Sequence, residues 1–242
     1  MKKLRELFAG VMVTGALAVG SSAYAGDFGS YRAVLDSSSG LVRCLTVSVV
    51  GQTGPDTVNY SNYVGPFLMN EDSNPGETWY SFCTDLSATL RRTYDYCEVP
   101  VTGLAPDLTL GKPDWDRGGI QSAAAIYKAH VGGLDGMTGD SRKAYGAALQ
   151  LAIWEALYDT EGTYGLDGGN FTASVCSSEV TGYFDTFMGA AAGSYAGVNW
   201  LQPKVYGGSQ GGFRLVSVPE PASVLSSLVV LGLLVAGRRK VV

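Results

Sequence analysis

One cysteine and one glutamine carry the side chains that could form an unusual covalent bond in this chain. Cys83 lies in the segment WYSFCTD, and Gln150 lies 67 positions later in the segment AALQLAIWE. A thiol and a carboxamide can condense with loss of ammonia, and the product is an internal thioester that an outside amine can capture. A protein with this bond reacts once with its target, so it would not be a turnover enzyme.

The segment around Gln150 predicts a buried helix. From about residue 141 to 159, apolar and small side chains occupy nearly every face at helical spacing, which is typical of a helix surrounded by protein. A buried carboxamide without hydrogen-bond partners costs roughly 1–3 kcal/mol per group. Two hypotheses follow for Gln150: it is bonded to a neighbouring backbone, or it is converted to a thioester that has no amide donors.

The cysteine count offers a competing explanation. The chain has four cysteines: Cys44, Cys83, Cys97 and Cys176. In an exported protein an even number favours disulfides, and two disulfides allow three pairings. If Cys83 reacts with Gln150, one disulfide and one thiol remain, and we favour Cys44 with Cys97 because both lie on predicted strands.

Two short motifs resemble the thioester domain of bacterial surface adhesins. They are Phe82-Cys83-Thr84-Asp85 and Gln150-Leu151-Ala152-Ile153-Trp154. The resemblance implies that Cys83 supplies the thioester sulfur, that Gln150 supplies the acyl group, and that Trp154 packs beside the bond. Leu149 departs from the family pattern, which commonly has threonine there.

A reaction that releases ammonia also needs a proton donor. Asp85 is two residues from Cys83 and so points to the same face of a predicted strand. Glu155 lies on the predicted helix of Gln150. Both carboxyl groups are candidates to support the thioester, although solvated surface carboxylates are far commoner.

The N-terminal segment predicts a signal peptide over residues 1–25. Lys2, Lys3 and Arg5 precede an apolar run over 7–19, and Ala23-Tyr24-Ala25 matches an Ala-x-Ala cleavage site. The alternative is a membrane anchor, but the apolar run is short for a span.

The C-terminal segment, residues 218–242, has three parts in a fixed order. It begins with a Pro-Glu-Pro motif, Pro219-Glu220-Pro221, and continues with an apolar run over 222–236 that predicts a short transmembrane helix. It ends in a basic cluster formed by Arg238, Arg239 and Lys240. This order resembles the PEP-CTERM sorting signal of Gram-negative bacteria that produce exopolysaccharide. The resemblance implies recognition by an exosortase, a sorting protease at the membrane. The alternative is a plain C-terminal anchor.

The remaining residues, 26–217, are expected to form one thioester-type domain. Residues 26–218 contain 20 acidic and 11 basic side chains, a net charge of −9, which argues against a nucleic-acid partner. The only histidine is His130 and there is no Cys-x-x-Cys motif, so we expect no metal site and no cofactor. No acid–base pair in a shaped context indicates a hydrolase.

The pattern of apolar residues predicts an α+β fold. β-branched and aromatic residues predict strands at 30–35, 41–50, 59–64, 78–83 and 93–99. Helices are predicted at 119–130, 141–159 and 178–192, and residues 199–215 have mixed strand character. Asp140 or Ser141 is expected to cap the second helix. We therefore expect a mainly antiparallel β lobe followed by a helical lobe, with the Cys83–Gln150 site at their interface.

Together these patterns predict a protein exported across the inner membrane to the cell surface or extracellular matrix. It would attach covalently, through Gln150, to an amine-bearing surface protein or polymer. The alternative is a non-covalent structural protein of the exopolysaccharide matrix whose cysteines are paired as disulfides.

Overall fold

The structure is a computed structural model, and it describes residues 29–34, 42–50, 57–86, 93–104, 117–159, 164–174, 177–204 and 211–216. The predicted signal peptide, the predicted sorting signal with its transmembrane helix, and Cys176 lie outside these residues. Within them, no helix combines the length and the apolar character that crossing a bilayer requires.

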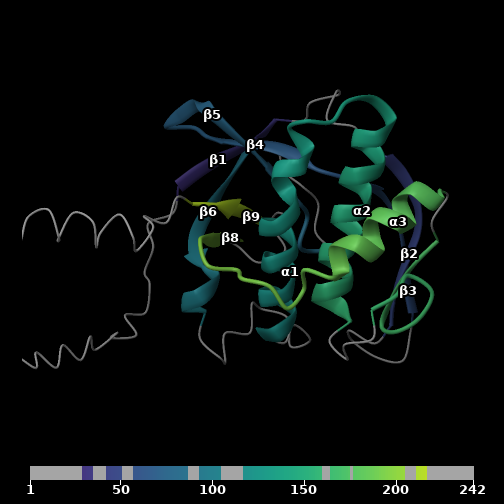
Figure 1. Cartoon of the computed structure of the whole chain (residues 1–242). Helices are drawn as coiled ribbons and strands as arrows, with labels where there is room; N and C mark the ends of the chain where they lie inside the picture. Colours follow the sequence, from purple (N-terminus) through teal and green to yellow (C-terminus); the bar gives the residue numbers. More distant parts are fainter. Residues whose placement is uncertain are drawn as a thin grey trace, which may run out of the picture.

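A six-stranded antiparallel sheet forms one side of the domain (Figure 1). Its strands follow the order β5-β4-β1-β6-β8-β9. Their bounds are β1 Gly29–Val34, β4 Phe67–Glu71, β5 Asn74–Ser81, β6 Thr93–Pro100, β8 Val198–Pro203 and β9 Gly212–Leu215.

A smaller antiparallel sheet lies on the other side of the helices. It has the order β3-β2-β7, with β2 Val42–Val50, β3 Thr57–Val64 and β7 Phe171–Ala173. The helices are α1 Arg117–His130, α2 Gly139–Tyr158 and α3 Ser178–Met188, with short 3₁₀ turns at η1 Val101–Gly103 and η2 Val131–Leu134. Figure 1 shows α1 and α2 between the sheets: α1 contacts β9, whereas α2 contacts all three strands of the smaller sheet.

The antiparallel sheets and three helices confirm the predicted α+β class, but strands and helices are not segregated along the chain. β7 lies between two helices, and β8 and β9 follow α3. These late strands complete sheets begun by the first half, because antiparallel pairing can join segments from any part of a chain. The expected order, a β lobe followed by a helical lobe, is therefore wrong.

Some local predictions also need correction. β4 was not predicted, since Phe67–Glu71 contains no β-branched residue, and the three residues of β7 are too few to show a period. β5 ends at Ser81, so Cys83 lies beyond the strand. Thr138 is the N-cap residue of α2 and makes no side-chain capping bond, so neither Asp140 nor Ser141 caps this helix.

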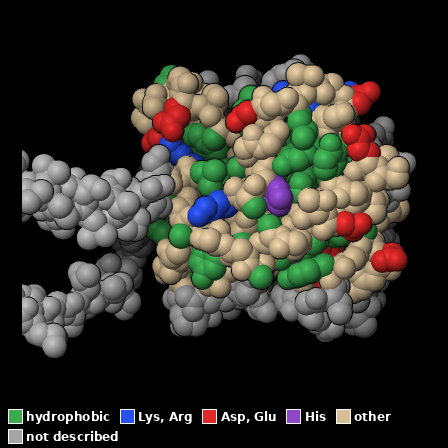
Figure 2. Space-filling model, in the orientation of Figure 1, with side chains coloured by type: hydrophobic (Ala, Val, Ile, Leu, Met, Phe, Trp, Pro, Cys, Tyr) green, Lys and Arg blue, Asp and Glu red, His purple; other side chains and the backbone are tan. Residues whose placement is uncertain are grey.

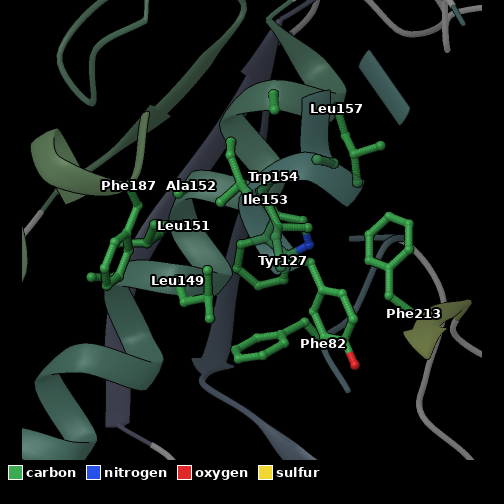
Figure 3. Packing of buried hydrophobic residues seen from close by; sticks show 14 of the residues in the cluster. Phe82, Tyr127, Leu149, Leu151, Ala152, Ile153, Trp154, Leu157, Phe187 and Phe213 are labelled. Carbon is green, nitrogen blue, oxygen red and sulfur yellow. The ribbon is translucent and has the colours of Figure 1, made fainter. Parts of the chain in front are cut away.

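The larger sheet has a hydrophobic cluster on each face. The main cluster joins the helices to one face of the sheet through side chains such as Trp200 and Phe213. Figure 3 shows Phe213 and Phe82 beside Tyr127 of α1 and the apolar residues of α2. The second, smaller cluster lies on the opposite face and contains Phe67, Met69, Tyr96 and Leu201.

The two ends of the strand order, β5 and β9, come together. The Ser81 hydroxyl donates to the backbone carbonyl of Phe213 at 3.0 Å and accepts from the Phe213 N–H at 3.0 Å. Farther on, the N–H of Thr84 donates to the carbonyl of Gly211 at 3.3 Å. These bonds curl the sheet and anchor the segment that carries Cys83.

Candidate functional site

Gln150 lies in the most buried part of α2. All residues from Ala144 to Tyr158 are buried, and the Gln150 side chain is only 1% exposed. The side chains of Leu149, Leu151 and Ile153 on the same helix pack into the main cluster (Figure 3). The structure thus confirms the predicted buried helix, and the Gln150 carboxamide needs partners inside the protein.

The backbone of Cys83 provides both partners. The Gln150 carboxamide nitrogen, Nε2, donates to the carbonyl oxygen of Cys83 at 2.8 Å. The carboxamide oxygen, Oε1, accepts from the N–H of Cys83 at 2.8 Å. This reciprocal pair is the pattern that a hydrogen-bonded residue of a neighbouring antiparallel strand would make. The carboxamide of Gln150 therefore substitutes for a strand alongside residues 82–85, which have irregular structure.

This pairing has a chemical consequence for the carboxamide carbon. It holds that carbon against the residue that carries the thiol, and the two residues are 67 positions apart in sequence. The N–H of Cys83 also points at the oxygen on which negative charge would develop during attack at this carbon. A fixed backbone donor of this kind is the basic element of an oxyanion hole.

The Cys83 thiol is partly buried, contacts both hydrophobic clusters and is not part of a disulfide. Burial, together with the nearby charge of Asp85, raises the pKa of the thiol to about 12. At neutral pH the sulfur is therefore protonated, and the thiolate, which is the nucleophilic form, is scarce. Any attack by this sulfur requires a base that removes its proton.

Asp85 is the predicted supporting residue whose charge reaches the thiol. Its side chain is 3% exposed, and its charge is one of the two causes of the raised pKa of Cys83. The next residue, Leu86, donates its N–H to the hydroxyl of Tyr158 at 3.0 Å. This bond fixes the chain after Asp85 to the end of α2.

Trp154 lies one helical turn after Gln150, so both side chains leave α2 on nearly the same face. The indole is 2% exposed, and its ring centroid lies 6.4 Å from that of Phe171 on β7. Its Nε1 is buried without a hydrogen-bond partner among the described residues. The indole therefore excludes water from this part of the helix without providing a bond.

Glu155 points elsewhere. Five positions after Gln150 correspond to about 140° around the helix axis. Its carboxylate accepts the N–H of Gly165 at 2.7 Å, in the segment that leads to β7. Burial and the charges of Asp159 and Asp167 raise the pKa of Glu155 to about 8, although the Gly165 bond opposes this. The structure brings Glu155 to this acidic cluster, and a role at the thioester stays a prediction.

Two positioning residues were missed by sequence reasoning, Ser81 and Tyr127. The fully buried Ser81 bonds to Phe213, as described above. The Tyr127 hydroxyl donates to the carbonyl of Tyr80 at 2.7 Å. A single serine on a strand or tyrosine on a helix carries no signal for such bonds, because their partners are distant in sequence.

Other predicted features are placed only in part. Cys97 lies on β6 of the larger sheet and Cys44 on β2 of the smaller one, and their pairing stays a prediction. Among the described residues, no group of three or more His, Cys, Asp or Glu side chains is arranged to hold a metal ion.

Comparisons with known proteins leave the family open. No family model matches the chain, and no curated protein matches it. Among solved structures, the chain is similar to the N-terminal domain of the Streptococcus pyogenes pilus tip adhesin Cpa, with 13% sequence identity and a TM-score of 0.35. This similarity covers 74% of the present chain and 96% of the adhesin domain.

Proposed function

We propose that this protein forms an internal thioester between Cys83 and Gln150 and uses it to attach covalently to an amine-bearing target. The observation that carries the proposal is the reciprocal pair of 2.8 Å hydrogen bonds between the Gln150 carboxamide and the Cys83 backbone. This pairing supplies proximity, which is one of the largest contributions to the rate of a reaction between two groups.

The proposed bond forms by attack of the Cys83 sulfur on the carboxamide carbon of Gln150. Asp85 accepts the thiol proton, and the N–H of Cys83 stabilises the negative charge on Oε1. The new carbon–sulfur bond replaces the carbon–nitrogen bond, and the departing nitrogen takes the proton from Asp85 and leaves as ammonia. The thioester is neutral, which suits a site where burial disfavours the thiolate.

Attachment reverses the roles of nitrogen and sulfur. An amine of the target attacks the same carbon of Gln150, the carbon–sulfur bond breaks, and the sulfur of Cys83 takes up the proton that the amine loses. The products are an amide between Gln150 and the target, and a free Cys83 thiol. The amide does not revert to thioester at an appreciable rate, so each molecule attaches once.

The ends of the chain support a place for this reaction outside the inner membrane. The proposed signal peptide at 1–25 directs export, and the proposed sorting signal at 218–242 is processed by an exosortase. The mature domain would then act at the cell surface or in the matrix.

A second candidate function is that of a non-covalent matrix protein. The same two hydrogen bonds favour it, because they satisfy the buried carboxamide of Gln150 without any reaction. Cys83 would then be an ordinary partly buried thiol.

Intact-mass spectrometry of the purified protein separates the two functions. The thioester lowers the mass by one ammonia, whereas a disulfide lowers it by two hydrogens. Cys83→Ala and Gln150→Ala should each abolish the ammonia loss, and methylamine should add to the wild type and expose one reactive thiol. A wild-type mass that retains the ammonia, with no methylamine adduct, would rule out the thioester.

A further inference from the structure

Two buried carboxylates lie one turn apart at the C-terminal end of α2. Glu155 and Asp159 are both 0% exposed, and a spacing of four residues makes them neighbours on the helix surface. Neither carboxylate forms an ion pair with any residue that the structure describes. Because a buried charge without a partner is strongly destabilising, this pair calls for a counter-charge.

The segment that follows α2 satisfies only half of each carboxylate. Oε1 of Glu155 accepts the N–H of Gly165 at 2.7 Å, and Oδ2 of Asp159 accepts the N–H of Asn170 at 3.3 Å. The other two oxygens, Oε2 of Glu155 and Oδ1 of Asp159, are buried and have no hydrogen-bond partner among the described residues. Since both carboxylates bond to residues 165–170, these two oxygens lie between that segment and the last turn of α2.

The surroundings of the two carboxylates are short of positive charge. The last turn of α2 has no basic residue, and the C-terminal end of a helix is itself partially negative. Residues 144–203 contain six acidic side chains and no lysine, arginine or histidine. Oδ1 of the exposed Asp167 lies 3.3 Å from the position of a Cβ on Gly165, so a third carboxylate is near. Figure 2 shows the same imbalance at the surface, where α3 carries acidic side chains and no lysine or arginine.

A proton shared between the two carboxylates would not satisfy both oxygens. Sharing a proton requires a direct hydrogen bond, and neither Oε2 of Glu155 nor Oδ1 of Asp159 makes one. A metal ion can hold both oxygens without direct contact between them, since Ca²⁺ lies about 2.3–2.6 Å from each of its oxygen ligands. Burial and the charges of Asp159 and Asp167 also raise the pKa of Glu155 to about 8, which reflects how strongly this site favours added positive charge.

We infer that Glu155 and Asp159 bind a divalent cation, and that Ca²⁺ is the ion that fits this site. Ca²⁺ accepts carboxylate, backbone carbonyl and water oxygens in a flexible shell of roughly six to eight ligands. The described residues offer no cluster of three side-chain ligands, so carbonyl groups of residues 164–170 and water supply the remaining oxygens. The carbonyl of Leu166 is not one of them, because it accepts the N–H of Ala173 at 2.8 Å.

The cation would join the end of α2 to the segment that leads into β7. Tyr158, which lies between the two carboxylates in the α2 sequence, accepts the N–H of Leu86 with its hydroxyl at 3.0 Å. The ion would therefore stabilise the turn of α2 that holds the chain three residues after Cys83. Binding of the ion does not require the thioester, so this inference stands independently of the proposed function.

Thermal unfolding of the purified full chain tests the inference. The protein is treated with EDTA, dialysed, and melted in CaCl₂, MgCl₂ or NaCl at matched ionic strength, so that general screening by salt is held constant. Calcium sites of extracellular modules have Kd values of about 10⁻⁴–10⁻³ M, so 10 mM Ca²⁺ should raise Tm by about 3–10 °C. Mg²⁺ should raise it less, because it demands a smaller octahedral shell and gives up water reluctantly.

Two variants remove the charge and keep the size of each side chain. Glu155→Gln and Asp159→Asn should each abolish the rise in Tm with Ca²⁺. Glu155→Gln retains an oxygen for the Gly165 N–H, and in EDTA at pH 7.5 it should melt at a higher temperature than the wild type, because the buried carboxylate is gone. Asp140→Asn is the matched control: its aspartate lies on the same helix with its side chain 94% exposed, and it should respond to Ca²⁺ like the wild type.

Terbium luminescence provides a second measurement on the same proteins. Tb³⁺ replaces Ca²⁺ at oxygen sites, and excitation through Tyr158, next to Asp159 in sequence, should give emission that Ca²⁺ competes away in the wild type. Glu155→Gln should give none.

A wild-type Tm that rises no more in CaCl₂ than in NaCl would overturn the inference and leave protonation of Glu155 as the way its charge is neutralised. The inference also fails if Glu155→Gln and Asp159→Asn keep the full response, which would place the ion at exposed aspartates. Methylamine adducts, counted by intact mass with and without Ca²⁺, report on the thioester separately, so that failure of one proposal does not decide the other.

Discussion

Replacing Cys83 with alanine is expected to lower the free energy of unfolding by about 4 kcal/mol, because it removes a covalent cross-link. The proposed thioester joins residues 67 positions apart, so it closes a long loop in the unfolded chain. The chain-entropy relation for such a loop gives about 4 kcal/mol at 25 °C. For a domain of this size, the loss corresponds to a fall in Tm of roughly 8–16 °C.

The structure separates this effect from ordinary packing losses. Both hydrogen bonds of Gln150 go to backbone atoms of residue 83, so the alanine variant, which keeps the carboxamide, can make both of them, whereas the thioester has lost the Nε2 donor. The remaining loss is that of one partly buried sulfur, which amounts to about 1 kcal/mol. A loss well above that value therefore reports the cross-link.

The assay is urea unfolding followed by tryptophan fluorescence, for which the buried Trp154 and Trp200 are suitable probes. Methylamine provides a control without mutation, since it opens the thioester and should lower wild-type stability by nearly the same amount as Cys83→Ala. The alanine variant itself should not respond to methylamine. Intact mass after each titration verifies the state of the bond.

The proposed cross-link is refuted if Cys83→Ala costs less than about 1.5 kcal/mol and methylamine leaves the wild-type unfolding curve unchanged. That pair of results would mean that Gln150 is held to Cys83 by hydrogen bonds alone.

Three further predictions concern the structures that support the site. Ser81→Ala leaves both backbone groups of Phe213 without their partner and should cost roughly 2–4 kcal/mol in urea unfolding, and a loss below 1 kcal/mol would show that water replaces the hydroxyl. Glu155 has a pKa raised from 4.5 to about 8, so it binds a proton more tightly in the folded state, and the free energy of unfolding should fall as pH rises from about 4.5 to about 8. Glu155→Gln should flatten this slope in thermal melts, and a pH profile identical to that of the wild type would contradict the raised pKa of Glu155. Gly169 has φ +87°, and an added Cβ would lie 1.6 Å from Oδ2 of Asp159, so Gly169→Ala should cost at least about 2 kcal/mol in chemical denaturation, and a neutral result would mean that the segment relaxes freely.

Much of the secondary structure could be predicted from local patterns. The alternation of aromatic and small residues located β6, and the nearly continuous apolar surface of α2 predicted its burial. Elements without a periodic signal were missed, as in β4 and β7. The end of β5 was placed two residues too late, since alternation in the sequence continues through Phe82 and Cys83.

The candidate site was likewise predictable from the sequence only in part. Burial of α2 implied that Gln150 needs a partner, and residue chemistry suggested Cys83. The tertiary structure decided that the backbone of Cys83, and not only its side chain, meets the carboxamide. It also turned Glu155 toward Gly165, where its carboxylate lies near Asp159 and Asp167.

The sequence by itself determined which segments are apolar, which helix is buried, and that a thiol and a carboxamide are both present. Only the tertiary structure decided that late strands complete the early sheets and that β5 and β9 meet through the Ser81 hydroxyl and the Arg214–Glu77 ion pair. The physical reason is the separation along the chain of the residues that contact one another. Periodicity records how each residue faces its near neighbours, whereas contacts across 67 or 132 positions depend on how all the buried surfaces pack together.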